Sequence, residues 1–348
     1  MHPSYGYAHC CAVLPVRHEN PEPQAAAPPA FPRFLYIIAA VKPWIRNTLV
    51  ALGLLVVVAG IVYYWLIVES HFPADAQYAL DIGEVRRLSG ALSADKPTAI
   101  EVERVGLFKF PATAIVAGDG WEARDMPVFS YRIVYPQTSV LIDTALNQEI
   151  GASLNSFYAD AFARMQTAMG SASLILITHE HMDHIGGLTS HPNLARVLAS
   201  TKLTREQLAE PKLMLPAKFP DRALDGYVPL VYQKYLGVAP GVVLIKAPGH
   251  SPGSQMIYVQ AANGAEYLFL GDVAWQFRNI DVQRERARLI TAFMIKEDRS
   301  AVFGQLAALK QLHTVEPRIH MVPGHDGAAV DELIAAGLMK ARFAAAGN

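Results

Sequence analysis

The sequence predicts an α+β domain that follows a single transmembrane helix. An uncharged apolar run covers residues 48–68. Further along, short alternating segments predict strands at 112–117, 129–135 and 139–143, and apolar residues at helical spacing predict a helix across 154–165. The predicted parts are a disordered tail with a basic flank, a transmembrane helix, a linker with a short helix around 81–92, and a folded domain: 1–47, 48–68, 69–97 and 98–348.

Composition excludes several classes of protein. Hydrophobic residues make up 52% of the 348 residues and charged residues 18%, which does not fit a disordered or collagen-like chain. With 30 Lys and Arg against 31 Asp and Glu, the net charge of −1 gives no broad surface for nucleic acid. The two cysteines, Cys10 and Cys11, are adjacent, so neither a disulfide framework nor a cysteine zinc site is expected.

The apolar run has the length and the borders of a membrane span. No charged residue lies between Arg46 and Glu69. A helix over 48–68 would be about 31 Å long at roughly 1.5 Å per residue, close to the hydrocarbon thickness of a bilayer. Trp44 stands just before the run, and three aromatic residues at 63–65 stand near its end, as at membrane interfaces. We therefore interpret 48–68 as a transmembrane helix.

The distribution of basic residues predicts the orientation of this helix. Arg33, Lys42 and Arg46 precede it, whereas the first basic residue after it is Arg86. The positive-inside rule then places the N-terminus in the cytoplasm and the domain in the periplasm or outside the cell. A cleaved signal peptide is the alternative, since residues 74–76 have a small-x-small pattern. An uncleaved anchor is favoured because the apolar run exceeds the roughly 7–15 residues of the apolar region in a signal peptide.

The N-terminal tail receives no function. Residues 1–33 contain seven prolines and show no apolar periodicity, which is typical of a disordered segment. An alternative is that translation begins nearer Val41, where a basic segment would already precede the apolar run.

Potential metal ligands are concentrated after a predicted buried strand at 174–177. The segment 178–187 reads Thr-His-Glu-His-Met-Asp-His-Ile-Gly-Gly. Imidazole and carboxylate are ligands of zinc and similar ions. His179 and His181 lie two residues apart on extended chain and can share one ion, while Asp183 and His184 can reach a second ion. The alternative, a solvated histidine loop, is disfavoured because four such groups occur within six residues.

This HxHxDH segment resembles the signature of the metallo-β-lactamase-fold hydrolase superfamily, and the motifs that follow are similar in order. The resemblance implies a four-layer αβ/βα sandwich and a lactonase- or glyoxalase II-like set of ligands. By that resemblance, His250 completes the first ion's set, Asp272 bridges both ions, and His325 completes the second set. These residues follow predicted strands at 242–246, 267–270 and 318–322. Asp143 is implied to brace the ligand loop. Two residues beyond it, Ala145 stands where the family often has glycine.

The implied chemistry is hydrolysis by two divalent metal ions, with zinc as the expected ion. Shared hydroxide would attack a lactone, ester or thioester carbonyl, and Asp183 would orient it and move a proton. An aspartate at position 272 makes antibiotic hydrolysis less expected than these reactions. A mononuclear-iron persulfide dioxygenase and a phosphodiesterase of the same fold are alternatives, and an anchored binding module without activity is a third.

Two segments are expected to line the substrate pocket. They are 210–235, with Leu213, Met214, Phe219, Tyr227 and Tyr232, and 274–294, with Trp275 and Phe277. Their apolar content favours a small-molecule substrate with an apolar tail, although the same residues could simply complete the core. The basic cluster at 284–288 is interpreted as the solvated face of a helix. The remaining domain histidines are expected at the surface or packed, and not on metal: His191, His313 and His320.

Overall fold

The structure, a computed structural model, describes residues 42–71, 73, 76–154 and 156–344. The predicted tail up to residue 41, with both cysteines, lies outside the described residues. The chain divides into two compact units after residue 58. Helix α2 (Pro43–Tyr63) is followed by the π-helical turn η1 (Tyr64–Val68). By length and composition this helix is apolar enough to cross a membrane, and almost all of it is exposed.

The first of two mixed sheets has the strand order β11-β1-β2-β3-β5, and β4 also pairs with β1. β1, β2 and β3 are antiparallel neighbours, whereas β3 and β5 run parallel. The long β1–β2 pair runs from Ala99 opposite Val134 to Pro111 opposite Ala123, and its register shifts once, at a bulge between Arg104 and Gly106. The strands of this sheet are β1 (Ala99–Pro111), β2 (Ala123–Val134), β3 (Ser139–Ile142), β4 (Ser156–Phe157), β5 (Leu174–Leu176) and β11 (Lys340–Ala341).

The second sheet has the order β10-β9-β8-β7-β6. β10 runs parallel to β9, and the other neighbours are antiparallel. Its strands are β6 (Tyr235–Ala239), β7 (Val242–Lys246), β8 (Gln255–Gln260), β9 (Glu266–Gly271) and β10 (Ile319–Pro323). The two mixed sheets implied by the family resemblance are therefore confirmed.

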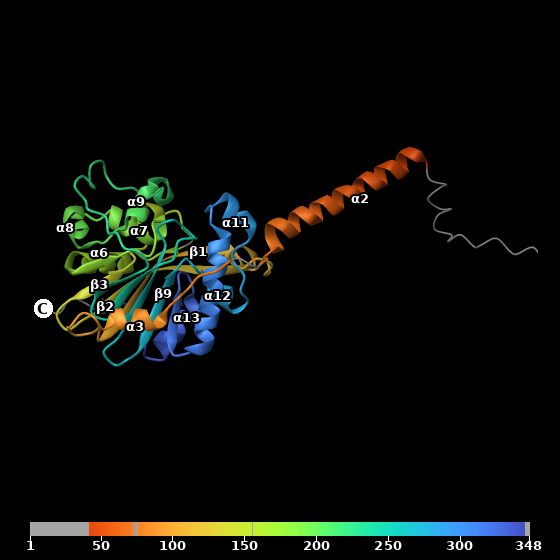
Figure 1. The fold of residues 1–348 in the computed structure, drawn as a ribbon. Helices are drawn as coiled ribbons and strands as arrows, with labels where there is room; N and C mark the ends of the chain where they lie inside the picture. Colours follow the sequence, from red (N-terminus) through yellow and green to blue (C-terminus); the bar gives the residue numbers. More distant parts are fainter. Residues whose placement is uncertain (1–41, 72, 74–75, 155, 345–348) are drawn as a thin grey trace, which may run out of the picture. The chain divides into compact units, whose positions relative to one another are not determined.

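The sheets pack face to face, and helices cover their outer faces. Alternation along β7 shows this, because Leu244 packs between the sheets while Val243 and Ile245 pack outward. Helices α6 and α7 cover the outer face of the first sheet, and α3 and α12 cover that of the second (Figure 1). The domain thus has four layers, helix–sheet–sheet–helix.

The helices of the domain differ widely in length, from one turn to more than four. They are α3 (Ile82–Ser89), α4 (Ala112–Ile115), α5 (Gln148–Gly151), α6 (Ala159–Ser171), α7 (Met182–Thr189), α8 (Leu194–Ser200), α9 (Arg205–Ala209), the 3₁₀ turn η2 (Pro211–Met214), α10 (Phe277–Asp281), α11 (Arg288–Phe293), α12 (Arg299–Val315) and α13 (Gly327–Ala335).

Two predicted elements were wrong. The strands predicted before the four histidine and aspartate motifs are confirmed as β5, β7, β9 and β10, and the helix predicted around 81–92 is confirmed as α3. The segment 112–117 is not a strand, because the β1–β2 pairing ends at Pro111 and the chain turns there into α4. The helix expected across 154–165 begins only at Ala159, since residues 156–157 pair with β1 as β4. In both places, sheet pairing overrides the local apolar pattern.

The close approach of α7 to the chain after β3 gives a testable prediction. A Cβ at Gly187 would lie 2.2 Å from the backbone oxygen of Thr144, whereas a Cβ at Gly170 in α6 would meet nothing within 4 Å. We expect Gly187→Ala to lower the free energy of unfolding by about 1–3 kcal/mol through overpacking. The matched Gly170→Ala should raise it by roughly 0.5–1 kcal/mol. Chemical denaturation of the full chain measures both, and equal effects would contradict the packing described.

Candidate metal centre

The ends of strands in both sheets bring the predicted ligands together. His179 and His181 follow β5, and His181 is the N-cap residue immediately before α7. Asp183 and His184 occupy the first turn of α7. The other three predicted ligands follow strands of the second sheet: His250 after β7, Asp272 immediately after β9, and His325 after β10.

The first cluster contains His179, His181, His250 and Asp272, whose ligand atoms all lie within 4.8 Å of one another. Nδ1 of His181 is 2.9 Å from Nε2 of His250. Oδ2 of Asp272 is 3.3 Å from Nε2 of His250 and 3.7 Å from Nε2 of His179. The four atoms therefore surround one small volume.

The second cluster contains Asp183, His184 and His325. Oδ2 of Asp183 is 3.5 Å from Nε2 of His325 and 4.0 Å from Nε2 of His184. Oδ1 of Asp272 is 3.2 Å from Nε2 of His325 and 3.3 Å from Nε2 of His184. Asp272 consequently turns one oxygen toward each cluster.

The donor atoms fit a pair of divalent cations. Nε2 of His179, Nε2 of His184 and Oδ1 of Asp272 are buried without a hydrogen-bond partner among the described residues. An unpaired buried polar atom costs about 1–3 kcal/mol of stability, so three such atoms at one place indicate a missing partner. Nitrogen and carboxylate oxygen are the donors that zinc takes. The two clusters are therefore compatible with a binuclear metal site.

Burial and mutual contacts set the protonation of the cluster residues. Burial lowers the pKa of His179 and of His181 well below the usual value, which keeps their imidazoles neutral. Burial opposes ionisation of Asp272, but the surrounding imidazoles, with His325 foremost, hold the pKa of its carboxyl well below the usual range. Burial also acts to lower the pKa of His250 and of His325, but the neighbouring carboxylate of Asp272 outweighs burial and raises the pKa of both rings above the usual value. Because metals take neutral imidazole and ionised carboxylate, a bound cation would displace protons from these two rings.

Asp143 contacts the loop that follows β5 and the His184 ring. Its Oδ1 accepts the Thr178 backbone N–H at 2.7 Å, and its Oδ2 accepts the Thr178 hydroxyl at 2.8 Å. The same Oδ2 lies 2.8 Å from Nδ1 of His184, which leaves Nε2 of that ring facing the second cluster. Asp143 has φ +58° and Ala145 has φ +49°. Ala145 therefore adopts the left-handed conformation that explains glycine at this position in the family.

Glu180, which stands between the first two histidines, does not face the clusters. Its carboxylate accepts from the Ser251 hydroxyl at 2.8 Å and from the Gly253 N–H at 3.1 Å. It thereby fixes the loop that carries His250 to the loop that follows β5. The sequence motif alone did not reveal this role.

A buried arginine supports two of the cluster residues from behind. Nδ1 of His250 is 3.0 Å from Oε2 of Glu297, and Glu297 forms a buried ion pair with Arg286. The Arg286 guanidinium lies 4.9 Å from the ring centroid of Trp275, whose indole N–H donates to Oδ2 of Asp272 at 2.6 Å. Arg286 thus holds the two side chains that orient His250 and Asp272.

This arrangement corrects the interpretation of 284–288 as a solvated helix face. Arg286 is fully buried and Glu285 is 1% exposed. Residues 284–287 form an irregular loop before α11, which begins at Arg288. The buried charges of this loop have partners outside it: Glu297 for Arg286 and Arg299 for Glu285. Local sequence could not show these partners.

A cavity of about 340 Å³ opens beside the two clusters, and its wall is largely apolar. Three of the side chains expected at the pocket line it: Leu213, Trp275 and Met294. Lys212 and Leu215, also from the first expected segment, line it as well. Apart from the cluster residues, the lining residues that lie outside both expected segments are Phe108, Phe110, Met126, Met182 and Ile295. Phe108 and Phe110 lie two residues apart on β1 and so face the same side of the sheet, and Phe108 pairs with Met126 of β2. The alternation of apolar residues along β1 was therefore the sequence pattern that could have indicated these lining residues.

Several residues expected at the pocket pack elsewhere. Met214, Phe219 and Tyr227 belong to the core beside the first sheet, and Tyr232 packs on the core between the sheets. Phe277 packs edge to face against His313, with 4.9 Å between the ring centroids. For these residues, the alternative of completing the core is the correct one.

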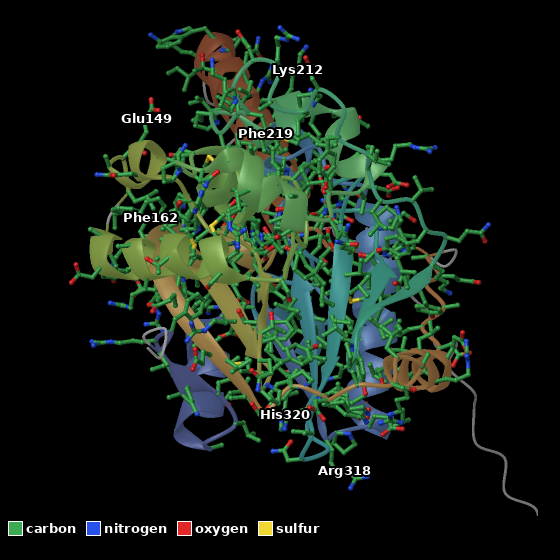
Figure 2. The ribbon with its side chains drawn as sticks, turned by 90° about the vertical axis from the view of Figure 1, so that its left-hand side faces the viewer. Glu149, Phe162, Lys212, Phe219, Arg318 and His320 are labelled. Carbon is green, nitrogen blue, oxygen red and sulfur yellow. The ribbon has the colours of Figure 1, made fainter. Side chains whose placement is uncertain are left out.

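The remaining described domain histidines do not join the clusters. Nε2 of His191 is 3.1 Å from the Gln166 carbonyl oxygen. Figure 2 shows His320 at the end of the molecule opposite Lys212, a cavity residue. Both agree with the expectation that these histidines do not bind metal.

Comparison with known proteins identifies the family. The model of the metallo-beta-lactamase superfamily matches residues 123–325, more than half of the chain and the whole span of the two clusters. The chain belongs to the metallo-β-lactamase superfamily. It is a metal-dependent hydrolase of that superfamily, as predicted. No curated protein matches the chain at a significant level.

Solved structures share the metallo-β-lactamase fold at low sequence identity. An N-acyl homoserine lactone hydrolase with the product N-hexanoyl-L-homoserine at its catalytic metal centre is 16% identical, with TM-score 0.52 over 68% of this chain and 96% of that chain. A quorum-quenching N-acyl homoserine lactone lactonase is 18% identical, with TM-score 0.52 over 67% and 93%. A probable metal-dependent hydrolase from Staphylococcus aureus is 14% identical, with TM-score 0.52 over 67% and 91%.

The support behind His250 gives a second prediction. Glu297→Gln removes the charge that neutralises buried Arg286 while keeping a side chain of the same shape. Removing one partner of a buried ion pair should cost about 3–5 kcal/mol of stability. Loosening His250 should weaken zinc affinity about 10–100-fold. Denaturation and competition with a zinc chelator measure the two effects.

Glu149→Gln is the matched control, because Glu149 is exposed in the short helix α5 (Figure 2). It should change stability by no more than about 0.5 kcal/mol and leave zinc affinity unaltered. Unchanged zinc affinity in Glu297→Gln would show that Glu297 does not position His250.

Proposed function

We propose that this metallo-β-lactamase-fold protein is a dinuclear hydrolase of lactones, esters or thioesters with an apolar tail. In this proposal, His179, His181 and His250 hold one divalent ion, and Asp183, His184 and His325 hold the other. The observation that carries the proposal is the placement of Asp272, whose Oδ2 faces the first cluster and whose Oδ1 faces the second. A carboxylate between two groups of imidazoles suits a bridge between two cations.

Zinc is the ion that these ligands favour, and the chain's own residues supply the rest of the chemistry. Two such cations, when bound, lower the pKa of water and polarise a carbonyl oxygen. Asp183 lines the cavity and is more exposed than Asp272, so it is the carboxylate that would orient attacking water and pass a proton to the leaving oxygen or sulfur. Trp275 closes the wall behind Asp272 and excludes water from that side.

The cavity wall supports a substrate with an apolar tail. Phe108, Phe110 and Trp275 present aromatic surface next to the polar cluster residues. A mainly apolar wall with a few polar groups at one end is typical of small-molecule sites. The structural neighbours include hydrolases that bind acyl homoserine lactone products, which is consistent with this class of substrate.

We also propose that residues 48–68 anchor the protein in a membrane, with the N-terminal flank in the cytoplasm and the hydrolase domain outside it. The exposed apolar helix α2 supports an anchor, and the basic residues before it support the orientation. The boundaries at residues 47 and 68 are part of the same proposal. The expected boundary at 97 lies too late, because α3 (82–89) already packs on the second sheet.

The proposal predicts metal content and activity together. The purified full chain should bind two zinc ions and hydrolyse members of a panel of lactones, esters and thioesters. His325→Ala should lose one zinc ion, and Asp183→Asn should lower kcat/KM by about 10²–10⁴-fold through loss of proton transfer. Elemental analysis and steady-state kinetics measure both.

His320→Ala is the matched control for metal binding. It removes a histidine of β10, the strand that His325 follows, and His320 belongs to neither cluster. It should retain two zinc ions. A single iron per chain would contradict the proposal in favour of a dioxygenase. A zinc-loaded protein that hydrolyses no member of the panel would contradict the assigned substrates.

A further inference from the structure

The last turn of the apolar segment is fixed against the hydrolase domain at α11. The carbonyl oxygen of Ile67 accepts the Gly118 N–H at 3.0 Å. The guanidinium of Arg288, the first residue of α11, lies 4.7 Å from the ring centroid of Trp65, and it forms an ion pair with Glu69. All of these residues belong to the same compact unit, 59–348.

The outer face of α11 exposes large apolar side chains. Leu289 and Phe293 are one helical turn apart and are 42% and 68% exposed, and the next residue, Met294, is 52% exposed. Thr291, on the opposite side of the helix, is buried. We refer to Leu289, Phe293 and Met294 as the α11 patch.

The α11 patch continues into the cavity. Met294 belongs to both, because it is exposed and also lines the cavity together with Ile295. Across the same cavity, Leu215 lines the wall and is 55% exposed. An apolar path therefore leads from the surface of α11 to the side chains of the two clusters.

Aromatic residues surround the point where the apolar segment meets the domain. Trp121 is 61% exposed, and its indole N–H donates to the Tyr63 hydroxyl at 3.2 Å. Tyr64 and Trp65 are also exposed to a large extent. Tyrosine and tryptophan are the residues that concentrate at the level of lipid headgroups.

We propose that the α11 patch rests on the surface of the lipid bilayer that the apolar helix enters, and that the cavity takes its acyl substrate from this surface. Trp65 lies three residues before the end of the apolar run and touches α11, so a bilayer that contains this run reaches the level of the patch. The continuity between the anchor and the patch favours lipid over a second copy of the chain. This inference rests on the anchor and the hydrolase activity proposed above.

The first experiment measures where the patch lies, without any substrate. The full chain carries Cys10→Ser and Cys11→Ser, and a spin label is attached at a single new cysteine. Phe293→Cys reports the patch, Val56→Cys reports α2, and Val315→Cys reports an exposed apolar residue at the end of α12. In phosphatidylcholine and phosphatidylglycerol nanodiscs, collisions with oxygen and with a water-soluble nickel chelate are compared for each label.

The ratio of oxygen collisions to nickel-chelate collisions should be several-fold higher for the label at position 293 than for the label at 315. The label at 56 should have a higher ratio still. If 293 behaves like 315 while 56 is in lipid, the anchor stands and the membrane contact of α11 is overturned. Dipolar broadening between labels at 293 would mean that a second copy covers the patch, which also overturns it. A label at 56 that is open to nickel would overturn the anchor, and this inference with it.

The second experiment measures delivery of substrate. In full-length protein, Leu289→Asp with Phe293→Asp should lower turnover of a long-chain lactone held in vesicles several-fold, while turnover of a short water-soluble lactone stays unchanged. Val315→Asp should alter neither. Equal loss for both lactones in the double variant would overturn delivery from the lipid surface, whereas absence of turnover in the unmodified protein would instead overturn the proposed activity.

Discussion

The carboxylate of Asp272 lies between two groups of imidazoles, and much of the domain is arranged to keep it there. Burying an ionised carboxylate is costly unless opposite charge or donors meet it on every side. Oδ2 has the Trp275 indole N–H at 2.6 Å, but Oδ1 has no hydrogen-bond partner among the described residues. Two cations would supply what Oδ1 and the inward-facing imidazole nitrogens lack. The contacts behind the clusters serve to hold this geometry before any cation binds.

The two sheets make that geometry rigid. Each cluster draws ligands from both sheets, because His179 and His184 follow β5 of the first sheet while His250 and His325 follow strands of the second. The distance between ligands therefore depends on how the sheets pack on each other. Buried charged side chains add a second constraint, since Arg286 and Glu297 connect the loop before α11 to His250. Arg288, the first residue of α11, contacts Trp65 and Glu69, so the residues that follow α2 pack beside the loop that supports His250.

Sequence patterns predicted which residues come together in the two clusters, because these residues follow short apolar strands and a polar residue after such a strand emerges at the edge of a sheet. The ordering of these motifs also led to the fold. The contacts of Arg286 and Glu297 were not predictable, since their partners are distant in sequence and a cluster of basic residues normally faces water. Likewise, the segment 112–117 has the alternation of a strand, but the long β1–β2 pairing makes it a turn with helix α4. Phe108 and Phe110 could have been assigned to the cavity only by knowing which face of β1 meets the ligand loops.

Anomalous X-ray diffraction at the zinc edge, from crystals of the zinc-loaded full chain, can establish whether Asp272 joins two metal sites. We expect two anomalous peaks about 3.5–4 Å apart, one among His179, His181 and His250 and the other among Asp183, His184 and His325. The Asp272 carboxylate should lie between the peaks, with one oxygen toward each. A single peak, or two peaks with Asp272 bound to neither, would contradict the account.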